Sequence, residues 1–187
     1  MENKYGICKA IGQVAWGYIF ILFHINIGSI DILPGWIGYM LFFEALPYLE
    51  TAERTAGLLR PLTIGLGIWE LVLWVTNIYE VSVDWYAVAM LANVIELYFN
   101  FQILTNIAMI ADRYQMEQRD SLLRLRTIVT ILMTIMALPI PMDGEWQMVV
   151  LGLGIVAIVV LIWICSLLFS LRKRLAYYFE NVERGRE

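Results

Sequence analysis

Three glutamates, Glu44, Glu70 and Glu96, lie inside long apolar stretches of a chain of 187 residues. A carboxyl group in such a setting can hold a proton, coordinate a hard metal cation or balance an organic cation. The sequence places no lysine or arginine at the same depth. Like charges in a low-dielectric setting cannot all be ionised, so a proton or a bound cation must neutralise part of the group. The three acids therefore predict a site for protons or cations and argue against an anion.

Asparagines accompany two of these acids along their own helices. At 100° per residue, Asn93, Glu96 and Asn100 fall within about 60° of one another on one helical face. Asn77 shares a face with Glu70 in the preceding apolar stretch. Their amides are suited to orienting a bound cation beside the acids. The competing interpretation is structural, because protonated glutamates and asparagines can also hydrogen-bond between helices and hold them together.

The single histidine, His24, lies in the first apolar stretch on the same helical face as Gln13 and Gly17. It is suited either to proton handling or to a structural hydrogen bond in the helix packing. The candidate set for binding an ion or a substrate is therefore Glu44, Glu70, Glu96, Asn93, Asn100, Asn77 and His24.

Transmembrane helices are the elements that must position these side chains. Apolar residues make up 60% of the chain, charged residues only 16%, and the mean hydropathy is +0.70. A soluble domain carries nearer to a quarter charged residues, and its apolar positions are periodic rather than continuous. No polar linker divides the chain, so we predict one all-α domain over residues 1–187 with six transmembrane helices. The spans are expected at about residues 7–27, 35–49, 61–78, 85–111, 122–138 and 148–171, with an interfacial C-terminal tail at 172–187.

The basic residues are sorted to one side of this predicted bundle. All 13 lysines and arginines fall in the N-terminus, the second and fourth connections and the tail, whereas the other three connections are acidic. Short connections rich in lysine and arginine stay in the cytoplasm. We therefore predict a multi-pass protein of the plasma membrane, in a bacterial type of inner membrane, with both termini in the cytoplasm.

Several classes of function find no support in the sequence. Two cysteines without a Cys-x-x-Cys motif and one histidine exclude a thiol or histidine metal cluster, which leaves oxygen ligands and hard cations. Serine-hydrolase, zinc-protease and phosphate-loop motifs are missing as well. We expect no enzymatic activity, no cofactor and no nucleic-acid partner. The lipid bilayer is the expected partner. The few polar side chains of spans five and six are mainly hydroxyls, so these spans are expected to be scaffold or a homo-oligomer contact.

The stretch IDILPGWIGYMLFFEAL, residues 30–46, resembles a pattern in small integral-membrane proteins of Firmicutes whose function is uncharacterised. The resemblance covers one turn and one span and implies a membrane location without an activity. In size, six-span topology and cytoplasmic termini the chain is also similar to the substrate-binding components of energy-coupling-factor vitamin transporters. Those proteins carry an Ala-x-x-x-Ala contact in the first span, where this chain has Gly6 and Ala10.

The sequence leads to the hypothesis that the chain is a membrane protein that binds or transports a cation or a cationic small molecule. Coupling to protons is one way in which such transport could be driven. Two alternatives stay open. One is the substrate-binding subunit of a multi-component transporter, and the other is a non-transporting interaction protein whose buried acids are structural.

Overall fold

In the computed structural model the described residues are 2–22, 26–27, 30–31, 34–79, 85–138 and 146–184. They form six α-helices, one 3-10 helix and a pair of two-residue antiparallel strands. In chain order the elements are α1 (Glu2–Leu22), β1 (Asn26–Ile27), β2 (Ile30–Asp31), α2 (Gly35–Ala52), η1 (Arg54–Leu59), α3 (Arg60–Ile78), α4 (Tyr86–Arg113), α5 (Gln118–Met136) and α6 (Trp146–Arg184). The predicted all-α fold class is thereby confirmed for these residues, apart from the short strand pair.

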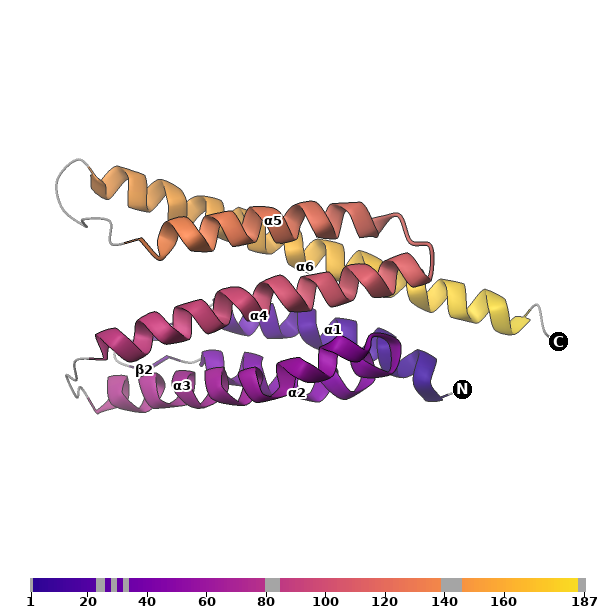
Figure 1. Ribbon diagram of the computed structural model, residues 1–187, viewed down its shortest axis with the longest axis horizontal. Coiled ribbons are helices and arrows are strands. Elements are labelled where there is room, and N and C mark those ends of the chain that lie inside the picture. Colours follow the sequence, from indigo (N-terminus) through magenta and orange to yellow (C-terminus); the bar gives the residue numbers. More distant parts are fainter. Residues whose placement is uncertain are drawn as a thin grey trace.

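The helices lie roughly along one another in an elongated bundle, with both chain termini at the same end (Figure 1). Helix α1 packs between α2 and α6, while α5 lies against both α4 and α6. Helix α3 packs mainly against α2 and makes a smaller contact with α4. Prolines mark two of the helix starts, since Pro34 precedes α2 and Pro61 occupies the first turn of α3, where a missing N–H costs nothing.

Within the residues that the structure describes, three segments are long and apolar enough to cross a membrane. They are Arg54–Ile78, which joins η1 and α3, Tyr86–Arg113 in α4 and Gln147–Val182 in α6. Their outward surfaces are rich in exposed apolar side chains, for example Ile68, Leu91 and Ile155. Such continuous apolar surface is typical of helices that face lipid rather than water.

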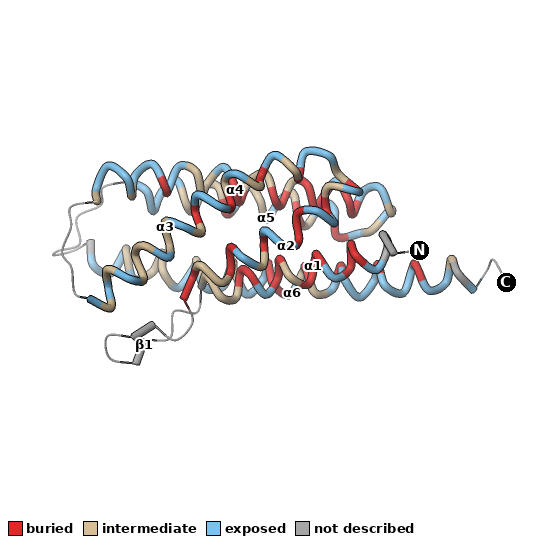
Figure 2. Tube along the Cα trace, turned by 90° about the horizontal axis from the view of Figure 1, so that it is seen from below, coloured by how far each residue is buried: buried red, intermediate tan, exposed pale blue. Residues whose placement is uncertain are grey.

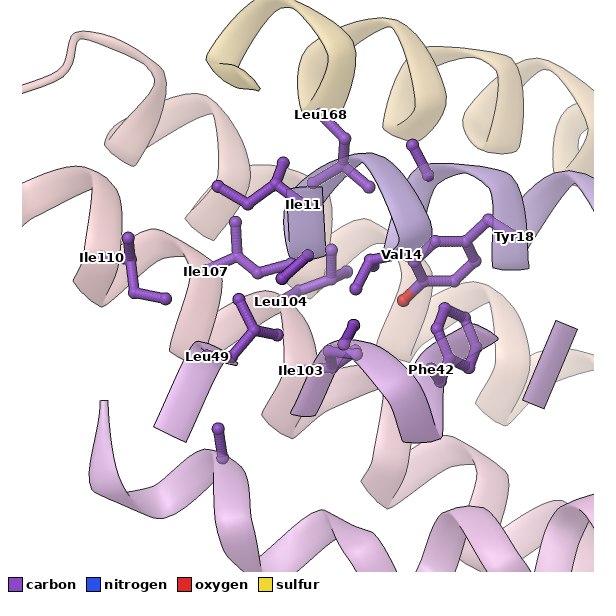
Figure 3. Packing of buried hydrophobic residues seen from close by; sticks show 14 of the residues in the cluster. Ile11, Val14, Tyr18, Phe42, Leu49, Ile103, Leu104, Ile107, Ile110 and Leu168 are labelled. Carbon is purple, nitrogen blue, oxygen red and sulfur yellow. The ribbon is translucent and has the colours of Figure 1, made fainter. Parts of the chain in front are cut away.

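Burial is concentrated in the half of the bundle that holds both termini, as Figure 2 shows. We call this part, residues 5–15, 45–60, 99–126 and 164–182, the closed half. Its core contains fully buried residues such as Ile11, Leu49, Leu104, Ile107 and Leu168, which meet at the centre of Figure 3. The open half, residues 35–44, 61–79, 85–98, 127–138 and 146–163, holds far fewer buried side chains.

Helices α1 and α2 approach closely near the boundary between the halves. A Cβ atom on Gly38 would lie 2.6 Å from the backbone oxygen of Gly17, and one on Gly17 would lie 2.7 Å from the ring of Phe42. Real Cβ atoms do not tolerate such distances, so this crossing requires glycine on both helices. The two glycines thereby set how α1 and α2 present the side chains that follow them.

The limits of two predicted segments differ from the helices found. Helix α1 begins at Glu2 and ends at Leu22, five residues before the end expected for the first span, because the chain turns into the strand pair. Helix α6 continues without a break to Arg184, so the tail expected at 172–187 is largely the last part of a 39-residue helix. Phe179, expected at the lipid interface, is 1% exposed and packs against Tyr114 with ring centroids 5.1 Å apart.

Candidate functional site: a cavity beside Glu96

A cavity of about 370 Å³ lies where the open half meets the closed half. Helices α1, α2, α4, α5 and α6 all contribute to its lining. Its size is in the range of pockets that hold small organic molecules. Among the described residues that line it, Glu96 is the acid, and none is a lysine or arginine.

Helix α4 supplies the polar wall of the cavity. Asn93, Glu96 and Asn100 all line it; Asn100 is buried, Glu96 is partly buried and Asn93 is exposed. The Asn100 Nδ2 donates a hydrogen bond of 2.9 Å to the backbone oxygen of Glu96. The carboxylate of Glu70, on the neighbouring α3, repels that of Glu96 electrostatically. A cation placed in the cavity would relieve this repulsion.

Four aromatic residues, which we call the aromatic wall, also line the cavity. They are Tyr18, Tyr39, Phe42 and Phe99, whose rings touch in a chain with centroid separations of 5.2 to 6.0 Å. Figure 3 shows the Tyr18 ring beside Phe42. The Tyr18 hydroxyl is buried and has no hydrogen-bond partner among the described residues, although its residue lines the cavity. A buried hydroxyl without a partner is costly, and this one has almost no surface open to the cavity.

This aromatic wall was not predicted from the sequence. Two of its members, Tyr18 and Tyr39, directly follow the glycines of the close α1–α2 crossing, Gly17 and Gly38. The repeated Gly-Tyr pair was the available signal, because each glycine brings the helices together and the next side chain is turned toward the interior. Helices α5 and α6, expected to be scaffold, also close the cavity, with apolar residues such as Met133 and Leu161.

The other predicted site residues do not gather around Glu96. Glu44 is exposed, and its Oε2 accepts a 2.8 Å hydrogen bond from Gln13 Nε2. It lines a separate groove of about 530 Å³ between α2 and α3. Asn77 is exposed near the end of α3, and His24 lies outside the described residues.

These positions weigh against a single three-carboxylate centre for a metal ion. Within the part of the chain that the structure describes, no three His, Cys, Asp or Glu side chains are grouped closely enough to hold a metal. Glu70 and Glu96 interact, whereas Glu44 lies on another surface. The aromatic and apolar lining around Glu96 also offers few oxygen ligands, which hard metal cations require.

Comparison of the chain with protein-family models, curated proteins and solved structures finds no match. In the substrate-binding components of vitamin transporters an Ala-x-x-x-Ala motif of the first span makes a contact, and Gly6 and Ala10 are its nearest match in this chain. Both residues are buried inside the bundle, and Gly6 packs against the ring of Tyr48. This pair is therefore engaged within the chain.

Proposed function

We propose that this protein is a multi-pass membrane protein that binds a small organic cation in the cavity beside Glu96 and carries it across the bilayer. The observation that carries the proposal is the composition of the cavity wall. One carboxylate and two amides share the cavity lining with four aromatic residues. Carboxylates attract a positive head group, and aromatic faces attract organic cations with an energy of about 0.5–2 kcal/mol each.

The apolar share of the lining favours an organic cation over a bare metal ion. A metal ion must exchange most of its water for protein oxygens, and side chains such as Phe99 and Leu161 cannot supply them. An alkylated or aromatic ammonium instead buries its carbon atoms against these side chains. The Asn93 amide adds a hydrogen-bonding group that could select a particular substituent.

Proton coupling is supported by Glu70 and Glu96, two acids on the neighbouring helices α3 and α4. Acids that share a low-dielectric setting without a basic partner are not all ionised, so the pair can hold a proton while the cavity is empty. A cation beside Glu96 favours ionisation of both groups, so binding would release that proton. This exchange is a simple way to link substrate movement to a proton gradient.

For the membrane arrangement we propose six spans, with both termini in the cytoplasm of a bacterial-type cell. The uneven placement of the basic residues supports it. Single cysteines at Ser29, Ser82 and Gly144 should react with an impermeant thiol reagent added to intact cells, and one at Ser121 should not. Labelling at Ser121 from outside would contradict this topology.

The binding proposal is tested with two probes of nearly the same shape. Benzyltrimethylammonium carries a positive charge, and neopentylbenzene is its neutral analogue. We expect the protein in lipid nanodiscs to bind the cation with one site per chain and to prefer it to the neutral analogue. Glu96→Gln keeps the size and removes the negative charge, so it should weaken cation binding by about tenfold or more.

A matched control is Glu180→Gln, since Glu180 is exposed on the last part of α6, far along that helix from the cavity lining. It should leave binding unchanged. If Glu96→Gln retains the fold and binds the cation as the parent does, the acid is structural and the transport proposal fails.

A further inference from the structure

Glu44 differs from Glu96 in its surroundings, because its side chain is on the outer surface of α2. It is exposed and lies among exposed apolar neighbours, Met40 at 54% and Phe43 at 43%. The Gln13 amide donates a hydrogen bond to the carboxylate, yet an amide cannot neutralise its charge. An ionised carboxylate facing lipid near the middle of a membrane helix is unfavourable unless an opposite charge meets it.

The helices that line the groove carry no such charge at this depth, because the sequence has no lysine or arginine from residue 35 to residue 53 or from residue 61 to residue 112. These ranges include all of α2 and nearly all of α3 and α4. Two basic side chains from neighbouring segments lie close by, but Lys9 has its Nζ 5.9 Å from the ring centroid of Tyr48, and Arg172 of α6 lies beside Gly12. A cation in the groove would place a positive charge directly beside the Glu44 carboxylate.

The groove beside Glu44 has the shape and lining for an apolar chain. It runs between α2 and α3, encloses about 530 Å³ and has apolar sides that include Phe43, Ile64 and Ile68. The hydroxyl of Thr63, which also lines it, donates to the backbone oxygen of Leu59 at 2.8 Å and is thus engaged within its own helix. The Glu44 carboxylate is left as the charged group of the groove.

We propose that the α2–α3 groove is a second binding site, open to the bilayer, for an amphipathic organic cation. Its ammonium group pairs with Glu44, and its alkyl chain lies along the apolar sides of the groove. This inference rests on the proposed function, because the groove would bind the same class of substrate as the cavity, on the side of the protein that is open to the bilayer. Tyr39 lines both the groove and the cavity, so it forms the partition between the two sites.

The test compares octyltrimethylammonium with tetramethylammonium, which has the same head group without the chain. Binding is measured by equilibrium dialysis with the full chain in nanodiscs, after the lipid background is subtracted. We expect two octyltrimethylammonium sites per chain and one tetramethylammonium site. Glu44→Gln should weaken one octyltrimethylammonium site by about tenfold and leave tetramethylammonium binding unchanged.

Two further variants separate this inference from the proposed function. Ile68→Trp fills the groove without touching its charge, and it should weaken the same site as Glu44→Gln. Glu96→Gln should remove the tetramethylammonium site and leave the groove site in place. Size-exclusion elution and circular dichroism of each variant establish that it is folded.

If the chain binds octyltrimethylammonium at a single site that Glu44→Gln does not alter, the proposed groove site is wrong. If Glu96→Gln abolishes that single site, the proposed cavity site is still supported. Loss of both sites in Glu96→Gln would also overturn the groove as an independent site. If Glu96→Gln alters neither probe, the proposed function fails, and the effect of Glu44→Gln alone then decides whether the groove binds a cation.

Discussion

The closed and open halves of the bundle share helices α2, α4, α5 and α6 but are held together by different interactions. The closed half combines a continuous apolar core with polar contacts between segments, such as Arg60 with Glu50 at 2.6 Å and Thr55 with Asn106 at 2.8 Å. The open half relies on a few aromatic contacts, such as Trp36 with Trp74 at 6.3 Å between ring centroids. Tight packing is thus confined to the end that carries the basic residues, and space for a ligand occurs where it stops.

This difference indicates that the two halves have different roles: the closed half stabilises the fold, and the open half leaves space for the cavity. Helix packing in lipid gains little from the exclusion of water and depends on close contact and hydrogen bonds. The closed half supplies both, so it can hold the helices in register. The open half can then leave a cavity beside Glu96 without loss of the fold.

The largest difference between the halves is expected from truncation of a leucine. Leu104 is fully buried in the closed half, and Leu91, on the same helix, is 60% exposed in the open half. Leu104→Ala should lower the free energy of unfolding by about 2–4 kcal/mol, because it leaves a cavity among packed neighbours. Leu91→Ala should change it by less than about 0.5 kcal/mol. Equal effects in a nanodisc or detergent unfolding titration would show that the two halves are packed alike.

The α1–α2 crossing, at the boundary of the halves, should respond next most strongly. A Cβ atom on Gly38 would collide with the backbone of Gly17, so Gly38→Ala should destabilise the fold by about 1–3 kcal/mol. Gly65→Ala is the matched control, since a Cβ there meets nothing within 4 Å. It should be neutral or should stabilise α3 by up to about 1 kcal/mol. The two thermal shifts should therefore have opposite signs, and a rise for Gly38→Ala would refute the close crossing.

The smallest effect is expected at the turn from α4 to α5 in the closed half. Gln115 has a φ of 55°, and its N–H and that of Met116 bond back to Asp112 and Ala111 at 2.9 and 2.8 Å. This pattern is a Schellman turn, in which glycine is the favoured residue at the left-handed position. Gln115→Gly should raise the unfolding free energy by about 0.5–1 kcal/mol. Ser166→Gly, at an exposed position inside α6, should lower it instead.

Sequence periodicity was sufficient to predict which face of α4 lines a cavity, but it was insufficient to predict which way Glu44 of α2 points. In α4 the polar residues Asn93, Glu96 and Asn100 stand out from apolar surroundings, and their common face does line a cavity. In α2, Glu44 is an isolated acid among apolar residues on every side, so the pattern cannot distinguish the face toward lipid from the face toward other helices. Its orientation depends on the tertiary crossing of α1 with α2.

The ends of α1 and α6 show a second limit of the sequence. Apolar residues continue past Leu22, which made a span to residue 27 the natural prediction, but hydropathy carries no information on where a chain turns. In the tail, aromatic residues suggested contact with lipid head groups. Phe179 instead packs on Tyr114, a contact between residues 65 positions apart that no local pattern reveals.

The most direct test of the account is whether the open half admits a cation and the closed half excludes it. In a chain whose two native cysteines are replaced by alanine, single cysteines are placed at Ala157, which lines the cavity, and at Ala108, which is 1% exposed in the closed half. Each is treated with a trimethylammonium-bearing methanethiosulfonate and with neutral methyl methanethiosulfonate.

For the cysteine at position 157, the quantity compared is the ratio of its reaction rate with the cationic reagent to its rate with the neutral reagent. We expect this ratio to be about tenfold higher in the parent background than in the Glu96→Gln background. Benzyltrimethylammonium should protect it, and the cysteine at position 108 should react with neither reagent. A cysteine at position 157 that shows no charge preference, or one that Glu96→Gln leaves unchanged, would contradict the assignment of the cavity to a cation.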